Sequence, residues 1–173
     1  MKRFNKLIQW RLLLVCIIFI ITACSSNENS ATAPSTSELL EFTIDGVPYE
    51  ANLQSSGSSI RTFNAGGFTN VNVTGLFTSG IYTFTFRVGF EGDHTGSYTL
   101  SGMAEGANEG LDITIRQGLS NTTLHEAESI TLKVTTYQTS NGISMEATFS
   151  GTLTNKNTLE SLNLTNGKIV ILS

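Results

Sequence analysis

The side chains that most often act in catalysis are few, and they fall in short polar stretches. The 173-residue chain has two histidines, His94 and His125. His94 follows Glu91 and Asp93 between two glycines, where the three groups could ligate a hard cation, act as a base or meet a basic partner. His125 follows a run of Asn and Thr, and we expect both histidines in solvated loops. No catalytic residue is therefore predicted, and the protein is not expected to be an enzyme.

A second set of carboxylates surrounds a Gly-rich segment before Asp112. Calcium takes about six to eight oxygen ligands, and neither acidic stretch has the alternating Asp and Asn spacing of a dedicated calcium loop. We therefore expect neither a metal nor a cofactor, and we predict that partner contact uses these loops, whose acidic side chains favour a cation or a basic partner. The candidate binding residues are Glu91, Asp93, His94, Glu105 and Glu109.

Composition and motifs exclude several further classes of function. The sequence has no Gly-x-Ser-x-Gly nucleophile motif and no Gly-x-x-x-x-Gly-Lys phosphate loop. Four of the ten basic residues lie within the first eleven, so residues 24–173 contain six Lys and Arg against fourteen Asp and Glu, a formal charge of −8. Nucleic-acid binding depends on clustered basic side chains, so we expect no nucleic-acid partner.

Cys24 ends an N-terminal segment that is typical of secreted proteins. Four basic residues precede the apolar run 12–21, which is about half as long as a membrane-spanning helix requires. The sequence ITAC that ends at Cys24 resembles the lipobox of bacterial lipoproteins. By that resemblance, residues 1–23 are a signal peptide, the Cys24 thiol is acylated, and Ser25 favours delivery to the outer membrane. A plain signal peptide that ends near a cysteine is the alternative.

Residues 24–38 contain Ser, Thr, Asn and Ala with one Pro and no large apolar side chain. Such a segment buries too little surface to offset its ordering entropy, so we expect a flexible tether. A coil of this length spans about 20 Å root-mean-square, which would hold the domain beside the membrane.

From residue 39 onward, apolar and polar residues alternate. Tyr82, Phe84, Phe86 and Phe90 share one face of a segment whose other face has Thr and Arg. Such alternation is typical of half-buried antiparallel strands. We expect strands near residues 39–44, 47–53, 58–63, 68–77, 80–90, 96–101, 111–117, 128–138, 143–154 and 162–172. The predicted fold is an all-β, antiparallel two-sheet sandwich of nine or ten strands, and a small closed lipocalin-like barrel is the alternative.

Turn residues separate these strands. Asp45-Gly46 predicts a hairpin, and Asn166-Gly167 predicts a turn that interrupts the last strand. Pro48 cannot donate a backbone hydrogen bond, so its strand is expected at an edge of the sheet. Tyr137 lies opposite the apolar face of residues 130–134 and is a candidate stacking residue.

The two ends of the domain resemble small all-β lipoproteins of Gram-negative bacteria whose function is unassigned. The resemblance lies in the opening hairpin at residues 42–51, the strand at 149–153 and the final hairpin at 164–169. It implies a lipid-anchored β domain and supplies no catalytic residues.

Two hypotheses about function follow. The first is a monomeric, non-catalytic envelope module that is anchored to the outer membrane and binds a protein or a glycan. The second is a lipocalin-like carrier that holds a small apolar ligand in a barrel cavity.

Overall fold

Antiparallel strands form nearly all of the regular structure. The computed structural model describes residues 37–53, 58–104, 106–118 and 121–172, and these residues contain no α-helix. The strands are β1 (Leu39–Ile44), β2 (Val47–Asn52), β3 (Ser59–Ala65), β4 (Phe68–Leu76), β5 (Tyr82–Glu91), β6 (Gly96–Leu100), β7 (Gly110–Gln117), β8 (Asn121–Gln138), β9 (Ser144–Asn155) and β10 (Ser161–Ile171). The prediction of an all-β, antiparallel domain with about ten strands is confirmed.

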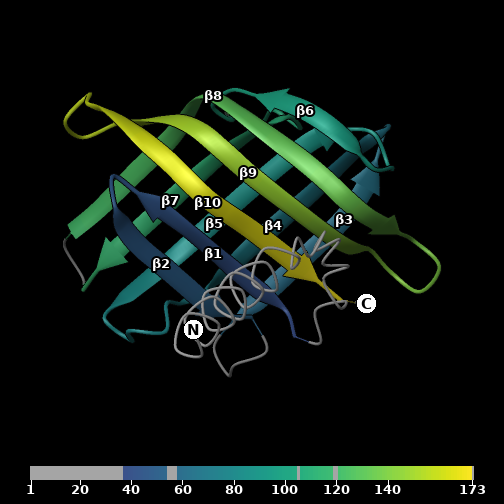
Figure 1. Ribbon diagram of the computed structural model, residues 1–173, viewed down its shortest axis with the longest axis horizontal. Coiled ribbons are helices and arrows are strands. Elements are labelled where there is room, and N and C mark those ends of the chain that lie inside the picture. Colours follow the sequence, from purple (N-terminus) through teal and green to yellow (C-terminus); the bar gives the residue numbers. More distant parts are fainter. Residues whose placement is uncertain (1–36, 54–57, 105, 119–120, 173) are drawn as a thin grey trace, which may run out of the picture. The chain divides into compact units, whose positions relative to one another are not determined.

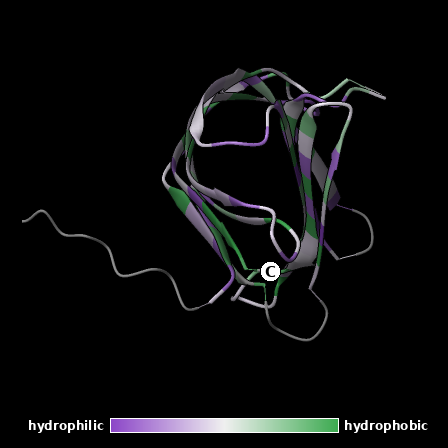
Figure 2. Cartoon of the chain, turned by 90° about the vertical axis from the view of Figure 1, so that its right-hand side faces the viewer, coloured by the Kyte–Doolittle hydropathy of each residue, from purple (hydrophilic) through white to green (hydrophobic). Residues whose placement is uncertain are grey.

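The strands form a single sheet that curls into a half-barrel (Figures 1 and 2). Their order is β2-β1-β10-β9-β8-β7-β5-β4-β3. β6 and β7 lie along the same edge of β8, where β6 pairs with residues 130–134 and β7 with residues 121–126. The two walls that enclose the core therefore belong to one hydrogen-bonded sheet.

The two ends of the sheet are β2 and β3, so Pro48 of β2 lies on an edge strand as predicted. The edge of β2 is joined to the turn between β4 and β5. The backbone N–H of Thr78 donates to the carbonyl of Glu50 at 2.6 Å, and the Thr78 hydroxyl donates to the same carbonyl at 2.9 Å. Phe42 and Phe77 meet edge to face beside this junction, with ring centroids 5.8 Å apart. Aromatic packing and two hydrogen bonds thus join β1 and β2 to the turn between β4 and β5.

Large apolar side chains fill the middle of the half-barrel. Phe86 of β5 is fully buried and faces Phe149 of β9, with ring centroids 5.4 Å apart. β5 and β9 are not neighbours in the sheet, so these rings meet across the interior. Burial of each such ring contributes about 1.5–3 kcal/mol of transfer free energy.

β8 contains two irregularities that change which side chains face inward. Its register shifts between Ala127 and Ser129 and again between Val134 and Thr136, and each shift reverses the alternation. The prediction for Tyr137 is therefore wrong, because the second shift turns this residue onto the inner face, where its ring approaches Phe90.

The same strand overturns the prediction of a polar loop around His125. β8 begins at Asn121, and His125 is only 6% exposed on the inner face. The Asn and Thr residues before it suggested a loop because they are polar, yet they form the first residues of β8.

The turn predicted at Asn166-Gly167 is also absent, since β10 continues through both residues. A register shift between Leu164 and Gly167 accommodates them as a bulge, with Asn166 in the left-handed region at φ 54°. A side chain at position 167 would collide with the ring of Phe149, which explains why glycine occupies it. The signal read as a hairpin turn thus marks a bulge.

Candidate functional site

The described acidic residues among those selected from the sequence are exposed, either at one end of the half-barrel or in the connection between β6 and β7. Glu91 ends β5, and Asp93 and His94 follow in the turn to β6 with their side chains about 70% exposed. His94 Nδ1 lies 3.6 Å from Asp93 Oδ1. Glu109 is exposed between β6 and β7, and Glu105 lies outside the described residues. Among the described residues, no three His, Cys, Asp or Glu side chains are grouped as a metal ion would require.

The turn at this end is positioned by internal hydrogen bonds. The Tyr98 hydroxyl donates to the carbonyl of His94 at 2.9 Å. The Thr69 hydroxyl donates to the carbonyl of Gly92 at 2.6 Å, so it accepts the 2.7 Å hydrogen bond from Tyr137. Burial, with a smaller contribution from the charge of Asp93, raises the pKa of Tyr98. We refer to this end, with Thr69, Tyr98 and Tyr137, as the closed end.

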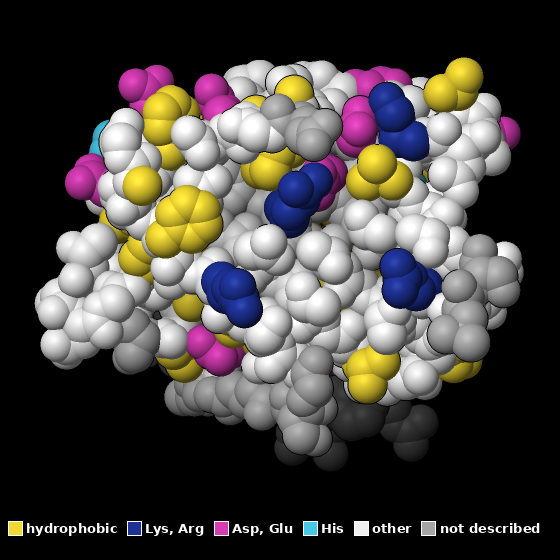
Figure 3. Space-filling view, turned by 180° about the vertical axis from the view of Figure 1, so that it is seen from behind, with side chains coloured by type: hydrophobic (Ala, Val, Ile, Leu, Met, Phe, Trp, Pro, Cys, Tyr) yellow, Lys and Arg dark blue, Asp and Glu magenta, His cyan; other side chains and the backbone are white. Residues whose placement is uncertain are grey.

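Asp112, which follows the second acidic stretch, already has a partner. It is 1% exposed and forms an ion pair with Arg87, whose Nε donates to Asp112 Oδ1 at 2.9 Å. This bond to the carboxylate is the main reason that the pKa of Arg87 is raised. Figure 3 shows the molecule from behind, where Lys and Arg side chains stand apart from one another, some of them beside Asp or Glu. The Asp112 carboxylate is thus a structural group.

The opposite end contains two adjoining pockets that share Tyr49 and Tyr82. The first, the seam pocket, has a volume of about 280 Å³ and lies between β2 and the β4–β5 turn. Its lining residues are Val47, Pro48, Tyr49, Glu50, Phe77, Thr78, Ser79 and Tyr82. The second, the amide pocket, has a volume of about 200 Å³. Its lining residues are Tyr49, Tyr82, Ile115, Gln117, Asn121, Thr123, His125 and Asn155. Together we call them the mouth.

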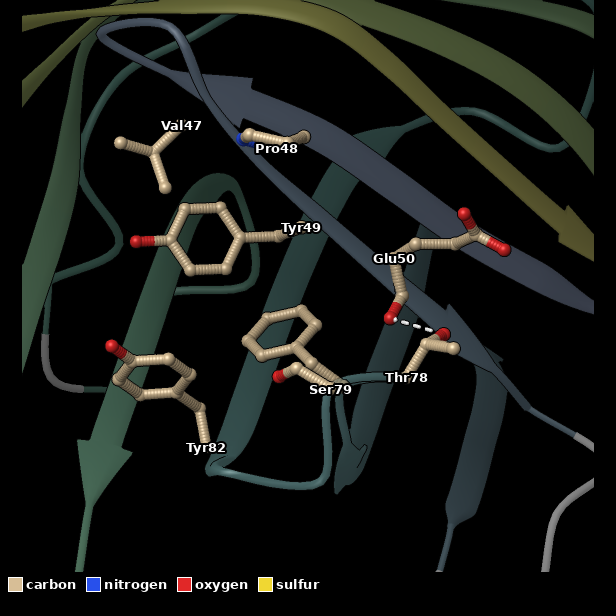
Figure 4. A pocket seen from close by; sticks show the side chains of 8 residues that line it. Val47, Pro48, Tyr49, Glu50, Thr78, Ser79 and Tyr82 are labelled. Atoms are coloured by element: carbon tan, nitrogen blue, oxygen red, sulfur yellow. Dashed lines mark hydrogen bonds between the residues drawn. The ribbon is translucent and has the colours of Figure 1, made fainter.

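Aromatic rings form the wall between the two pockets. Tyr49 and Tyr82 meet edge to face at a centroid distance of 6.4 Å, and Tyr49 lies 5.0 Å from Phe77. Their two hydroxyls point to the same side in Figure 4. Neither hydroxyl has a hydrogen-bond partner among the described residues. Burial, and to a lesser extent the nearby Tyr82, raises the pKa of Tyr49, so its hydroxyl stays protonated and can donate.

The inner faces of β5, β7 and β8 become polar toward the mouth. Cross-strand neighbours form three successive rows on these strands. From the core outward, the rows are Phe86–Ile113–His125, Phe84–Ile115–Thr123 and Tyr82–Gln117–Asn121. The amide pocket is therefore bounded below by the apolar core and at its rim by carboxamides.

His125 is the most buried polar group in this lining. Its Nδ1 lies 3.3 Å from the carbonyl oxygen of Ile113. A carbonyl can only accept, so Nδ1 carries the proton and Nε2 has the free lone pair. Burial lowers the pKa of His125 more than this hydrogen bond raises it, which favours the neutral ring. His125 thus offers an acceptor at the mouth.

Asn155 reaches the pocket from the start of the β9–β10 turn. Its Oδ1 accepts from the backbone N–H of Asn157 at 2.9 Å and of Thr158 at 3.3 Å. Asn157 in turn donates from Nδ2 to the carbonyl of Thr122 at 2.8 Å. The turn is therefore fixed to the first residues of β8, and the group that Asn155 retains for a ligand is its Nδ2 donor.

A larger and shallower hollow of about 510 Å³ lies on the outer face of β8, β9, β10 and β1. Lys133 and Lys168 flank its hydroxyl groups, and Glu41 lies beside Lys168 as its cross-strand neighbour. Its polar side chains are largely exposed to water. The mouth, which combines a buried imidazole with unpaired hydroxyls, is the stronger candidate.

The mouth residues were not identified by the sequence analysis. The available signal was the gradual change at inward positions from Phe and Ile to Tyr and Gln, on Phe86-Phe84-Tyr82 and Ile115-Gln117. Alternation identified these positions as inward but did not show that their strands end at an open edge.

Comparisons with protein-family models, with curated proteins and with solved structures find no match. In the part of the chain that the structure describes, no helix is long and apolar enough to cross a membrane.

Proposed function

We propose that this protein is a lipid-anchored lipoprotein of the bacterial outer membrane, and that its half-barrel binds a ligand at the mouth without transforming it. The observation that supports this best is the pair of unpaired hydroxyls on Tyr49 and Tyr82 beside the buried ring of His125. A ligand pocket combines apolar walls with a few polar groups, and hydroxyls that have no partner within the protein are available to bind a ligand.

Lipid anchoring is supported by the sequence around Cys24, which lies outside the described residues. The chain enters the half-barrel at Leu39, and β1 then runs toward the turn at Asp45-Gly46, beside the mouth. A tether from Cys24 would therefore join the domain at the closed end. The point at which the tether would join the domain is therefore at the end opposite the mouth.

The composition of the amide pocket, which holds the buried imidazole, supports binding rather than catalysis. His125 is the only imidazole in the amide pocket, and no carboxylate, serine or cysteine accompanies it among the eight lining residues. A general base usually acts with a nucleophile or with a group that orients it. The carrier hypothesis receives less support, because Phe86 and Phe149 meet in the interior where an apolar ligand would lie.

The anchor is tested by replacing Cys24 with alanine in cells supplied with labelled palmitate. We expect an unprocessed precursor without label, whereas the Cys16→Ala variant, altered within the apolar run, should be processed and labelled. A Cys24→Ala protein that is processed and labelled like the wild type would contradict the lipoprotein proposal.

The mouth is tested with the four tyrosines of the chain, two of which lie at each end. Ring-labelled tyrosine gives nuclear magnetic resonance signals that report on both ends in one sample. We expect the low-molecular-weight fraction of an envelope extract to shift the signals of Tyr49 and Tyr82 and to leave Tyr98 and Tyr137 in place. Shifts confined to the closed end would place binding there instead.

A further inference from the structure

We infer that the ligand of the mouth is a neutral saccharide. This inference rests on the proposed function and specifies the class of ligand for the same site. It follows from the charge, the hydrogen-bonding groups, the aromatic surfaces and the size of the two pockets.

The first step is the absence of charge from the lining of the amide pocket. Its eight residues are two tyrosines, three carboxamides, one threonine, one isoleucine and one histidine, whose burial favours the neutral form of its ring. A charged ligand would lose its hydration here without gaining a countercharge, which is costly. Glu50 contributes the one carboxylate to the seam pocket, and Figure 4 shows this carboxylate directed away from both tyrosine rings. The mouth therefore favours a neutral ligand.

The second step is the mixture of donors and acceptors. The hydroxyls of Tyr49 and Tyr82 and the Nδ2 of Asn155 can donate, and the Nε2 of His125 can accept. Gln117 and Asn121 each offer both kinds of group. A saccharide hydroxyl also donates and accepts, so neighbouring hydroxyls of one sugar ring can pair with this lining. A hydrocarbon chain would leave the same groups unpaired, at a cost for each one.

The third step is the flat apolar surface beside these groups. Tyr49 contacts both Tyr82 and Phe77, and it stacks on Phe42 with a centroid distance of 5.4 Å. This packing fixes the ring, so a ligand need not order it on binding. A sugar ring has a C–H face and a hydroxyl rim, and it matches an aromatic wall that is bordered by polar groups.

The fourth step is size. A pocket for a small molecule usually measures about 300–1,000 Å³, and either half of the mouth alone is smaller than this. The seam pocket of about 280 Å³ and the amide pocket of about 200 Å³ reach the lower part of this range together. Because they adjoin at the tyrosine pair, a short saccharide can place one ring on each side of it.

The test uses the full-length processed protein in a detergent without a sugar headgroup. A printed array of neutral and charged oligosaccharides is screened first, and the neutral oligosaccharide that binds best is then titrated by calorimetry. We expect the protein to bind neutral oligosaccharides on the array. We expect Tyr49→Phe and Tyr82→Phe each to weaken the affinity measured by calorimetry about threefold to tenfold, because each removes one hydrogen bond. Asn121→Ala should weaken it by a similar factor.

The matched control is Tyr98→Phe, which removes a tyrosine hydroxyl at the closed end and should leave the affinity unchanged. Circular dichroism and thermal unfolding of each variant show that the fold is retained. An array on which the wild type binds no neutral oligosaccharide overturns the inference.

A second arm separates this failure from a failure of the proposed function. Palmitate and a mixture of neutral tripeptides are added to tyrosine-labelled protein. If palmitate or the tripeptides shift the signals of Tyr49 and Tyr82 while no neutral oligosaccharide on the array is bound, the mouth binds a ligand and only the saccharide class is wrong. If saccharide binding is unaffected by Tyr49→Phe, Tyr82→Phe and Asn121→Ala together, the mouth is not the binding site, and the saccharide inference and the proposed binding function of the mouth both fail.

Discussion

The two ends of the half-barrel use tyrosine in opposite ways. At the closed end, Tyr98 donates to a backbone carbonyl and Tyr137 donates to Thr69, so both hydroxyls are paired within the protein. At the mouth, the hydroxyls of Tyr49 and Tyr82 have no such partner among the described residues, although their rings pack as closely. The same side chain stabilises one end and leaves hydrogen-bonding capacity at the other.

If the mouth binds the ligand as we propose, charge alone is a poor guide to the binding end. The closed end has Asp93 and His94, which attract notice in the sequence, but the hydrogen bonds there serve to hold the turn. The mouth has uncharged groups and a histidine that is buried. Partners within the protein, rather than residue type, distinguish the two ends.

The largest effect is expected at Phe86, which lies between the two ends. Replacing it with alanine removes a fully buried ring that contacts Phe149 and should lower the free energy of unfolding by about 3–5 kcal/mol. Urea unfolding measures this loss, and Thr85→Ala, on the other face of β5, is the control. Because the core supports both ends, all four tyrosine signals should shift. A loss below about 1 kcal/mol would show that the interior is not closely packed.

A smaller effect is expected at Thr69, which pairs with both Tyr137 and Gly92. Thr69→Val keeps the shape of the side chain but leaves a donor and an acceptor unpaired, so we expect a loss of about 1–3 kcal/mol in unfolding free energy. The counterpart at the mouth is Tyr82→Phe, which removes a hydroxyl without a protein partner and should change stability little. Equal losses from the two variants would refute the difference between the ends.

A pH-dependent effect is expected at His125. Burial lowers its pKa, so the unfolded chain binds a proton that the folded protein does not. Stability should therefore fall as the pH is lowered through the ordinary value near 6.5, and the fall continues until the folded protein also binds the proton. Urea unfolding at about pH 7.5 and about pH 5 should show a smaller loss in His125→Asn than in the wild type.

The matched control is His94→Asn, which alters the exposed histidine of the closed end and should keep the wild-type loss. If His125→Asn keeps it as well, another group is responsible for the acid sensitivity, and the argument for a neutral ring at the mouth loses its support.

The sequence predicted the strands well because alternation reports directly on burial. The bounds expected for β1 and β4 agree with the structure to within one residue, and Pro48 correctly indicated an edge strand. Bulges were the main source of error. An extra residue in β8 reverses the faces, so Tyr137 was placed outside, and the glycine beside Phe149 was interpreted as a turn.

The candidate site was harder to predict because it depends on contacts that are distant in sequence. The mouth forms where the edge strand with Tyr49 meets the beginning of β5 with Tyr82. His125 joins them only because β8 extends seven residues before the start that its apolar pattern indicated. Alternation within one strand does not contain this information.

The smallest effect is expected from the acidic side chains at and near the closed end. Their removal tests most directly whether the two ends differ in function. We consider the combined replacement of Glu91, Asp93, Glu105 and Glu109 by alanine. The described members of this set are exposed, so the free energy of unfolding should change by less than about 0.5 kcal/mol per site. Exposed charges are screened beyond about 10 Å at 0.1 M salt, so they should also have little influence on a neutral ligand at the mouth. Titration of the tyrosine-labelled variant with the neutral oligosaccharide should shift the signals of both mouth tyrosines as much as in the wild type. If the combined variant abolishes that response while the fold is retained, the acidic residues are the functional ones and the roles of the two ends are reversed.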